Sequence, residues 1–375
     1  MIRYLARLIV PLQTTYSVIM TPFDRYIGAA ALRAFVLVAA ALTALFSLLE
    51  FVEQLSSVGQ GHYGLSDALT YVLLTAPSRL LQVTPVSMLL GCLLALGAFA
   101  KNSELIALQG LGISEIRIIG AVLKLAVPVI VALFMMAEFV IPPTQQLAQA
   151  QRGSALSSAA PLRSDTSFWA HGDHQYLNVQ QFESGNAARN IDIYAFADGG
   201  SLTSFMHAER ADIKPDGTWS LIDVVRKRVD ASEFETEHLA TLPWSSFVSA
   251  EQIQFLILPP ETIPPIALYR YIHDLGQRHQ QAIRYEQELW RKASIPLSIV
   301  AMILIAAPFV FGPPRGQSTG RQITIGAVFG IVFSLSQQIV GHLDLLLDLN
   351  PVVAALAPSL LLMVLASYLF RRAHR

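Results

Sequence analysis

The sequence predicts a membrane α-helical protein with six transmembrane helices and an inserted all-β domain. Hydrophobic residues form 53% of the 375 residues and charged residues only 14%, whereas soluble domains carry roughly a quarter charged residues. Long apolar stretches lie in two groups of three, before residue 142 and after residue 292. Between the groups, residues 143–265 contain short runs of aromatic and β-branched residues, which indicate strands.

Each predicted span meets the requirement of about 20 largely apolar residues. The six stretches are 27–55, 65–100, 116–141, 293–312, 322–343 and 349–370. The third is the least apolar, because Lys124 and Glu138 shorten its uncharged centre. Both side chains are expected to reach the membrane interfaces by snorkelling. Pro142 and Pro143 are expected to end this span.

The distribution of basic residues predicts the orientation. They gather before the first span, after the second, after the fourth and at the carboxyl end: Arg3, Arg7, Arg25, Arg33, Lys101, Arg117, Lys124, Arg315, Arg321, Arg371, Arg372 and Arg375. Loops 56–64 and 344–348 contain no Lys or Arg. The positive-inside rule then places both termini in the cytoplasm of a multi-pass inner-membrane protein. The insertion 143–265 would lie outside the cytoplasm, in the periplasm of a Gram-negative cell.

The insertion is expected to fold as a sandwich or a jellyroll-like domain, because several short strands occur without a helical period. Pro215-Asp216-Gly217 marks a turn between two of the strands. After it, apolar residues at helical spacing predict an amphipathic periplasmic helix over 266–292 that leads into the fourth span. The predicted organisation is therefore an amino-terminal extension, 1–23; spans one to three, 24–142; the β domain, 143–265; the amphipathic helix, 266–292; and spans four to six, 293–375.

Residues 1–23 leave two interpretations open. Arg3 and Arg7 precede an apolar stretch that loosely resembles a signal peptide, but no small-residue cleavage site follows. The segment is either an interfacial amphipathic extension or an over-extended start with Met20 as the initiator.

Motifs for catalysis are absent from the sequence. There is no GxxxxGK[ST] phosphate loop, no HExxH and no GxSxG. The single cysteine, Cys92, lies in an apolar run, and one cysteine excludes an intrachain disulfide. The net charge of −1 gives no field that would attract nucleic acid. We therefore expect no catalytic residue, no metal and no cofactor in this chain.

Polar residues inside apolar stretches are the first functional candidates, because ionisable groups are costly in hydrocarbon and usually face a bundle interior or an interface. Glu50 lies at the end of the first span and Arg79 within the second. Simple exposure at the outer surface is the alternative for Glu50. On the fifth span, Ser334 and Gln338 belong to a polar cluster that either packs against another helix or lines a path.

A short cytoplasmic helix within 101–114 is the second candidate. Asn102 or Ser103 would cap it, and Gly110 and Gly112 suit its end. Glu104 falls in its first turn, where a carboxylate is favoured by the helix dipole and is available to an arginine of a partner. Such a helix is what a permease offers to a separate ATPase; a plain amphipathic turn is the alternative.

Several motifs in a fixed order resemble the permease subunits of the lipopolysaccharide-export ABC transporter, the YjgP/YjgQ (LptF/LptG) family. They are Phe23-Asp24-Arg25-Tyr26-Ile27, Phe51-Val52-Glu53-Gln54-Leu55 with Gly59-Gln60-Gly61, Ser103-Glu104-Leu105 with Gln109 and Gly112, Trp169-Ala170, Ile193-Tyr194-Ala195-Phe196, Tyr285 to Trp290-Arg291-Lys292, and Phe311-Gly312-Pro313-Pro314-Arg315. The resemblance extends from about Asp24 to the carboxyl end. The Gly-Gln-Gly and Trp-Ala elements are most similar to the G-type subunit.

The resemblance implies a partner F-type permease, a cytoplasmic ATPase dimer that binds the ATP, and a periplasmic bridge protein. It implies extraction of lipopolysaccharide from the inner membrane through a gate between the first and fifth spans, and a periplasmic β-jellyroll that hands the lipid on. The residues implied for ATPase coupling are Ser103, Glu104, Leu105 and Gln109. Those implied or considered for the lipid path and gate are Glu50, Arg79, Arg152, Ser334 and Gln338.

One departure from the family concerns the end of the first span. G-type subunits often carry basic residues there, whereas this chain has Glu50, Glu53, Ser56 and Ser57. Either the lipid carries less phosphate, or Arg79 and Arg152 meet it instead.

Two other functions stay open on the sequence: a mechanotransmitting ABC membrane subunit that passes no lipid, and a membrane receptor or assembly factor with a ligand-binding β domain.

Overall fold

The computed structural model describes most of the chain in two compact units. The described residues are 21–157, 168–172, 174–183, 187–197, 201–214, 218–229, 234–246, 259–277, 282–311, 319–347 and 350–373. One unit combines Met1–Gly153 with Pro264–Arg375, and the other is Ser154–Ile263. The predicted extension 1–23 lies almost wholly outside the described residues, which begin at Thr21.

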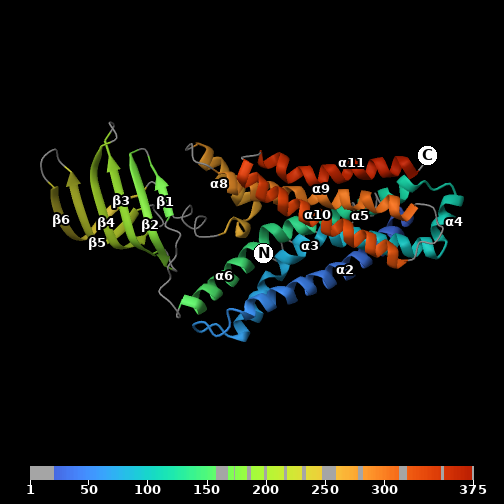
Figure 1. Ribbon diagram of the computed structural model, residues 1–375, viewed down its shortest axis with the longest axis horizontal. Helices are drawn as coiled ribbons and strands as arrows, with labels where there is room; N and C mark the ends of the chain where they lie inside the picture. The colour runs from blue at the N-terminus through green and yellow to red at the C-terminus, as the bar shows by residue number, and fades with distance from the viewer. Residues whose placement is uncertain are drawn as a thin grey trace. The chain divides into compact units, whose positions relative to one another are not determined.

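The first unit is helical, and six of its described helices are long and apolar enough to cross a membrane. They are α2 (Pro22–Leu55), α3 (Leu65–Lys101), α5 (Glu115–Phe139), α9 (Ile283–Phe311), α10 (Thr319–Leu347) and α11 (Pro351–Ala373). The six predicted spans are therefore confirmed as helices. In Figure 1 they run alongside one another as a bundle, with the short helix α4 (Glu104–Gly110) at one end.

Helix α3 is the most buried of these spans and packs against α2, α9 and α10. Leu89 and Leu93 on α3 are fully buried. Gly91 permits the close approach of α2, because a Cβ there would lie 2.7 Å from the Phe35 Cα. Small residues at such crossings let helix backbones pack closely where lipid supplies no hydrophobic driving force. The bundle is thus organised around one central helix.

Two segments depart from the expected helix boundaries. The third span does end close to the expected place, at Phe139, but Pro142 and Pro143 then lie in the first turn of a further helix, α6 (Ile141–Ser157), where proline's missing N–H removes no intrahelical bond. The helix expected over 266–292 is divided into α8 (Pro265–Gln277) and the first turns of α9. Gly276, a poor helix former, lies at the end of α8.

The second unit confirms the inserted β domain. Its six described strands form one antiparallel sheet in sequence order, as Figure 1 shows. They are β1 (Phe168–His171), β2 (Gln175–Glu183), β3 (Ala187–Phe196), β4 (Leu202–Ile213), β5 (Thr218–Val229) and β6 (Phe234–Ser245). The connectivity of these strands is a meander.

Both faces of the sheet carry apolar side chains. Leu177, Ile193 and Met206 are aligned across β2, β3 and β4 and belong to the buried cluster. The next residues in register, Tyr176, Tyr194 and Phe205, project from the opposite face because side chains alternate along a strand. The rings of Tyr194 and Phe205 lie 5.0 Å apart. The sheet therefore has a row of aromatic side chains on the face opposite its buried cluster.

Candidate functional site

The first candidate site is the Glu50 cluster, which we define as Glu50, Thr75 and Arg79. The Arg79 guanidinium donates two hydrogen bonds to the Glu50 carboxylate, from Nε at 2.8 Å and from Nη2 at 2.9 Å. Thr75 Oγ1 donates a third at 3.2 Å. Glu50 is only 7% exposed and Arg79 is 35% exposed. The bidentate pair therefore cross-links the end of α2 to the middle of α3, and the alternative of a freely exposed Glu50 is wrong.

Arg152 on α6 lies near this cluster, over an aromatic ring of α3. Its guanidinium carbon is 5.5 Å from the centre of the Tyr71 ring, a cation–π contact. Gln149, one turn earlier on α6, donates to the Tyr71 hydroxyl at 3.4 Å. The buried Nε of Arg152 has no hydrogen-bond partner among the described residues. A guanidinium held in this way keeps donors available for an anionic ligand.

The loop between α2 and α3 closes against the same end of α2. Tyr63 is 2% exposed, and its hydroxyl donates to Gln54 Oε1 at 3.2 Å. Burial raises the pKa of Tyr63, and the positive charge of Arg152 acts in the opposite direction. Glu50, Arg79 and Arg152 are thus gathered around one end of α2 by contacts that sequence spacing does not reveal.

Ser334 and Gln338 on α10 do not belong to the group formed by Glu50, Arg79 and Arg152. Among the described residues, neither side chain has a hydrogen bond to Glu50, Arg79 or Arg152. Helix α10 packs mainly against α3 and α11. Gln338 is exposed and Ser334 half-buried. They lie on a helix that presents a largely open flank, which includes Ile331, Leu335 and Ile339.

A second ionic site joins the start of α2 to α5. Asp24 is fully buried, with Lys124 Nζ at 2.9 Å and Arg117 Nη2 at 3.2 Å from its carboxylate. Thr21 and Asp24 also form a reciprocal capping box at the start of α2. Lys124 therefore pairs with a buried carboxylate and does not simply snorkel. The signal available in the sequence was Thr-x-x-Asp before a long apolar run.

The predicted coupling helix is α4, and its carboxylate contacts α2. The Tyr26 hydroxyl donates a hydrogen bond to Glu104 Oε2 at 2.9 Å, and Asn102 Nδ2 lies 3.4 Å from Glu104 Oε1. Ser103 occupies the N-cap position with φ +61°, in the left-handed region, and its side chain makes no capping bond. Leu105 is buried, which anchors α4 to the bundle. Gln109 Nε2 donates to Glu115 at 3.3 Å.

Large apolar side chains surround α4 on the surface. Ile106, Leu111 and Ile116 are 59%, 79% and 71% exposed, respectively. Gly112, at φ +84°, turns the chain back from α4 toward α5. An anchored helix with one accessible carboxylate and an apolar rim suits the docking of another protein.

Within the part of the chain that the structure describes, no group of three His, Cys, Asp or Glu is placed to hold a metal ion. The sites found are ion pairs between helices and a short surface helix. With six helices apolar enough to cross a membrane, the fold is that of a multi-pass membrane protein with an inserted β domain.

Residues 25–372 match the family described as lipopolysaccharide export system permease LptF/LptG, and the chain belongs to this family. It is 32% identical to lipopolysaccharide export system permease protein LptG of Haemophilus influenzae over 93% of this chain and 98% of that protein. It is 29% identical to the protein of the same name from Escherichia coli K12, over 94% of this chain and 99% of the relative.

Proposed function

We propose that this chain is the G-type permease half of an ABC transporter that takes lipopolysaccharide from the inner membrane and passes it to a periplasmic bridge protein. A second, F-type permease and a cytoplasmic ATPase dimer complete the transporter, and the ATPase binds the ATP. The observation that carries the proposal is the family match over nearly the whole chain, together with similarity to two relatives named LptG.

Glu104 is the residue we assign to ATPase coupling. Its carboxylate lies on a short helix that Leu105 anchors, among exposed apolar side chains. Tyr26 and Asn102 each donate to one oxygen of the carboxylate, and a bidentate arginine from the ATPase would add a second donor to each oxygen. Because Tyr26 belongs to α2, a pull on Glu104 would reach the first span directly. Ser103 stands at the N-cap of this helix, and Gln109 joins its end to Glu115 of α5.

The lipid path would run past the end of α2 where Arg79 and Arg152 lie. Both are cations within or beside apolar helices, and guanidinium groups bind phosphate with paired donors. Glu50 orients Arg79 through its two hydrogen bonds. The open flanks of α2 and α10, with Gln338 and Ser334 on the latter, would form the two sides of the gate. The lipid would then leave through the β domain.

The orientation that this function requires is the one that the basic residues predict, with both termini and α4 in the cytoplasm. Cysteine substitutions at Ser201 and Gln317 test it with a membrane-impermeant thiol reagent on intact spheroplasts. We expect labelling at position 201 only. Labelling of position 317 from outside contradicts the topology.

The coupling role is tested with Glu104→Gln and Glu104→Ala in the complete transporter. We expect lipid release to fail and binding of the ATPase to weaken, while the membrane helices assemble normally. Asp274→Asn is the matched control, because it removes an exposed carboxylate of α8 that belongs neither to the coupling site nor to the proposed lipid path. Normal transport by both Glu104 variants at normal expression would falsify the coupling role.

The lipid path is tested with photo-crosslinking residues at Glu50 and Gln338. We expect capture of lipopolysaccharide that ATP hydrolysis removes. A crosslinker at Val364, an exposed position of α11, serves as the control and should capture bulk phospholipid. Capture of bulk phospholipid alone at positions 50 and 338, unaffected by nucleotide, argues that both residues only pack.

A further inference from the structure

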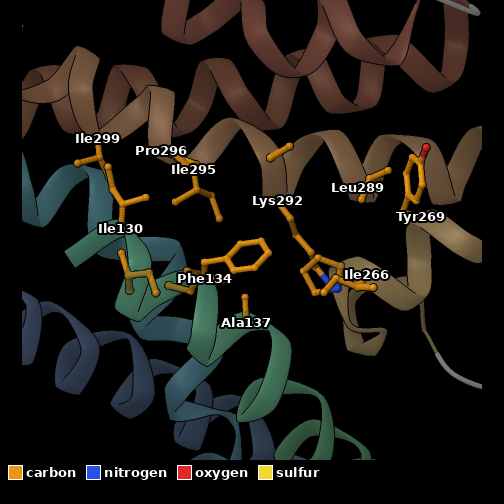
Figure 2. A pocket seen from close by; sticks show the side chains of 14 residues that line it. Ile130, Phe134, Ala137, Ile266, Tyr269, Leu289, Lys292, Ile295, Pro296 and Ile299 are labelled. Atoms are coloured by element: carbon orange, nitrogen blue, oxygen red, sulfur yellow. The ribbon is translucent and has the colours of Figure 1, made fainter. Parts of the chain in front are cut away.

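An apolar pocket of about 410 Å³ lies among α3, α5, α8 and α9, away from the residues of the Glu50 cluster. Its lining includes Leu81, Ile130, Phe134, Ile266, Leu289 and Ile299. Figure 2 shows the Phe134 ring projecting from α5 into the space beneath α9, and Lys292 reaching from α9 toward Ile266. The volume is within the range of small-ligand sites.

The pocket is elongated along the spanning helices. On α9 its lining extends from Leu289 to Ile299, which at helical rise corresponds to about 15 Å. One leaflet of the hydrocarbon core has the same thickness, about 15 Å. On α5 the lining extends along the same axis from Ile130 to Ala137, and Figure 2 shows Ile130 at the Ile299 end of the pocket, because α5 and α9 run in opposite senses. The groove thus matches the length and direction of one lipid chain in one leaflet.

The groove is open on one side to the surroundings of the helices. Phe134 is 51% exposed, and Ile266 and Tyr269 of α8 are also exposed. In a membrane protein, the surroundings of α5 at Ile130 and Phe134 are lipid chains. Tyr269 marks the interface end, because tyrosine is enriched where the chains meet the head groups.

Charged groups at that end are balanced. Lys292 lines the pocket, is 11% exposed and lies 3.5 Å from Glu288, which also accepts two hydrogen bonds from Arg291. Glu138 of α5 accepts a hydrogen bond from the backbone N–H of Ile266 at 3.1 Å. The positive charges of Lys292 and Arg291 therefore balance the negative charges of Glu288 and Glu138. A head group with both a phosphate and an ammonium complements this rim better than an anionic one.

We propose that this groove holds one acyl chain of a zwitterionic glycerophospholipid, with its phosphate beside Lys292, as a resident lipid that the transporter does not export. The lipid fills the space between α5 and α9 and supports α8, whose Ile266 N–H already donates to Glu138 of α5. The proposal does not depend on the identity of the exported lipid, because the groove shares no residue with the proposed export path.

The test places a photo-crosslinking residue at position 134 in the complete transporter. The complex is reconstituted in nanodiscs of phosphatidylethanolamine and phosphatidylglycerol with added lipopolysaccharide. Met135, the next residue, is the matched control: it is 40% exposed and does not line the groove. We expect severalfold enrichment of phosphatidylethanolamine adducts at position 134 over position 135, unchanged by ATP.

Each other outcome overturns the proposal. Equal adduct composition at both positions means that only bulk lipid is present. Lipopolysaccharide adducts that ATP removes place the groove on the export path, and enrichment of phosphatidylglycerol contradicts a zwitterionic lipid.

A second measurement uses Ala137→Phe, which fills the groove, and Lys292→Gln, which removes the ammonium. Native mass spectrometry of the intact complex should show loss of retained phosphatidylethanolamine in both variants. Full retention in both overturns the assignment. If Ala137→Phe fails to assemble, Lys292→Gln alone decides, because Glu288 keeps its hydrogen bonds from Arg291.

Discussion

The pairing of Glu50 with Arg79 predicts a strong energetic coupling between α2 and α3. The perturbation is a double-mutant cycle of Glu50→Gln, Arg79→Gln and the double variant. Two hydrogen bonds of 2.8 and 2.9 Å join the charged groups. Removing one partner of a buried ion pair costs about 3–5 kcal/mol, whereas an exposed pair contributes about 0.2–1 kcal/mol. Glu50 is buried and Arg79 is a third exposed, so we expect an intermediate coupling.

We take about 2 kcal/mol as the expected coupling free energy, between the buried and exposed limits. The assay is the free energy of unfolding of the four proteins in mixed micelles as denaturing detergent increases. Glu53→Gln is the control on the same helix, and an exposed substitution should change stability by less than about 0.5 kcal/mol. A coupling below about 0.5 kcal/mol, within the error of additivity, refutes the reasoning. Arg79 would then be available to the lipid independently of Glu50.

Three further predictions concern the bundle. Asp24→Asn leaves Lys124 and Arg117 without their buried carboxylate, but both cations are a third or more exposed, so the free energy of unfolding should fall by about 1–3 kcal/mol, between the exposed and buried limits; unchanged stability in the same assay contradicts the pairing. Tyr26→Phe removes the hydroxyl bond to Glu104 but keeps the carboxylate, so ATPase pull-down should be normal while lipid release slows; weakened pull-down would mean that Tyr26 orients the binding surface. Gly91→Leu forces α2 away from α3 and should cost at least about 1–3 kcal/mol, as overpacking does; a melting temperature equal to the parent's refutes the close contact.

Element type and the family could both be predicted from the sequence alone. The apolar runs are long enough to span a membrane. Because backbone N–H and C=O groups in lipid must form hydrogen bonds within the protein, such runs fold as helices. The strand patterns of 143–265 are equally local, since alternation and turn residues act over a few positions. The short motifs from Asp24 onward resemble the family to which the chain belongs.

Boundaries were less predictable where a residue suits two structures. Pro142 and Pro143 are typical of a helix end, but proline is also favoured in a first turn, and the chain uses them to start α6. The segment 266–292 has a helical period throughout, yet α8 ends at Gln277. Ala282, just before α9, is not helical, and an apolar period alone does not indicate where one helix stops and the next begins.

The sequence by itself determined that this chain spans a membrane, that it carries an inserted β domain, and which residues are expensive in lipid. Only the tertiary structure decided what each such residue pairs with: Glu50 with Arg79, and Asp24 with Lys124 across 100 positions of the chain. The physical reason is that the cost of a charge in hydrocarbon is a property of one residue, whereas its compensation needs a partner within a few ångströms. Sequence separation says nothing about that distance until the helices have packed.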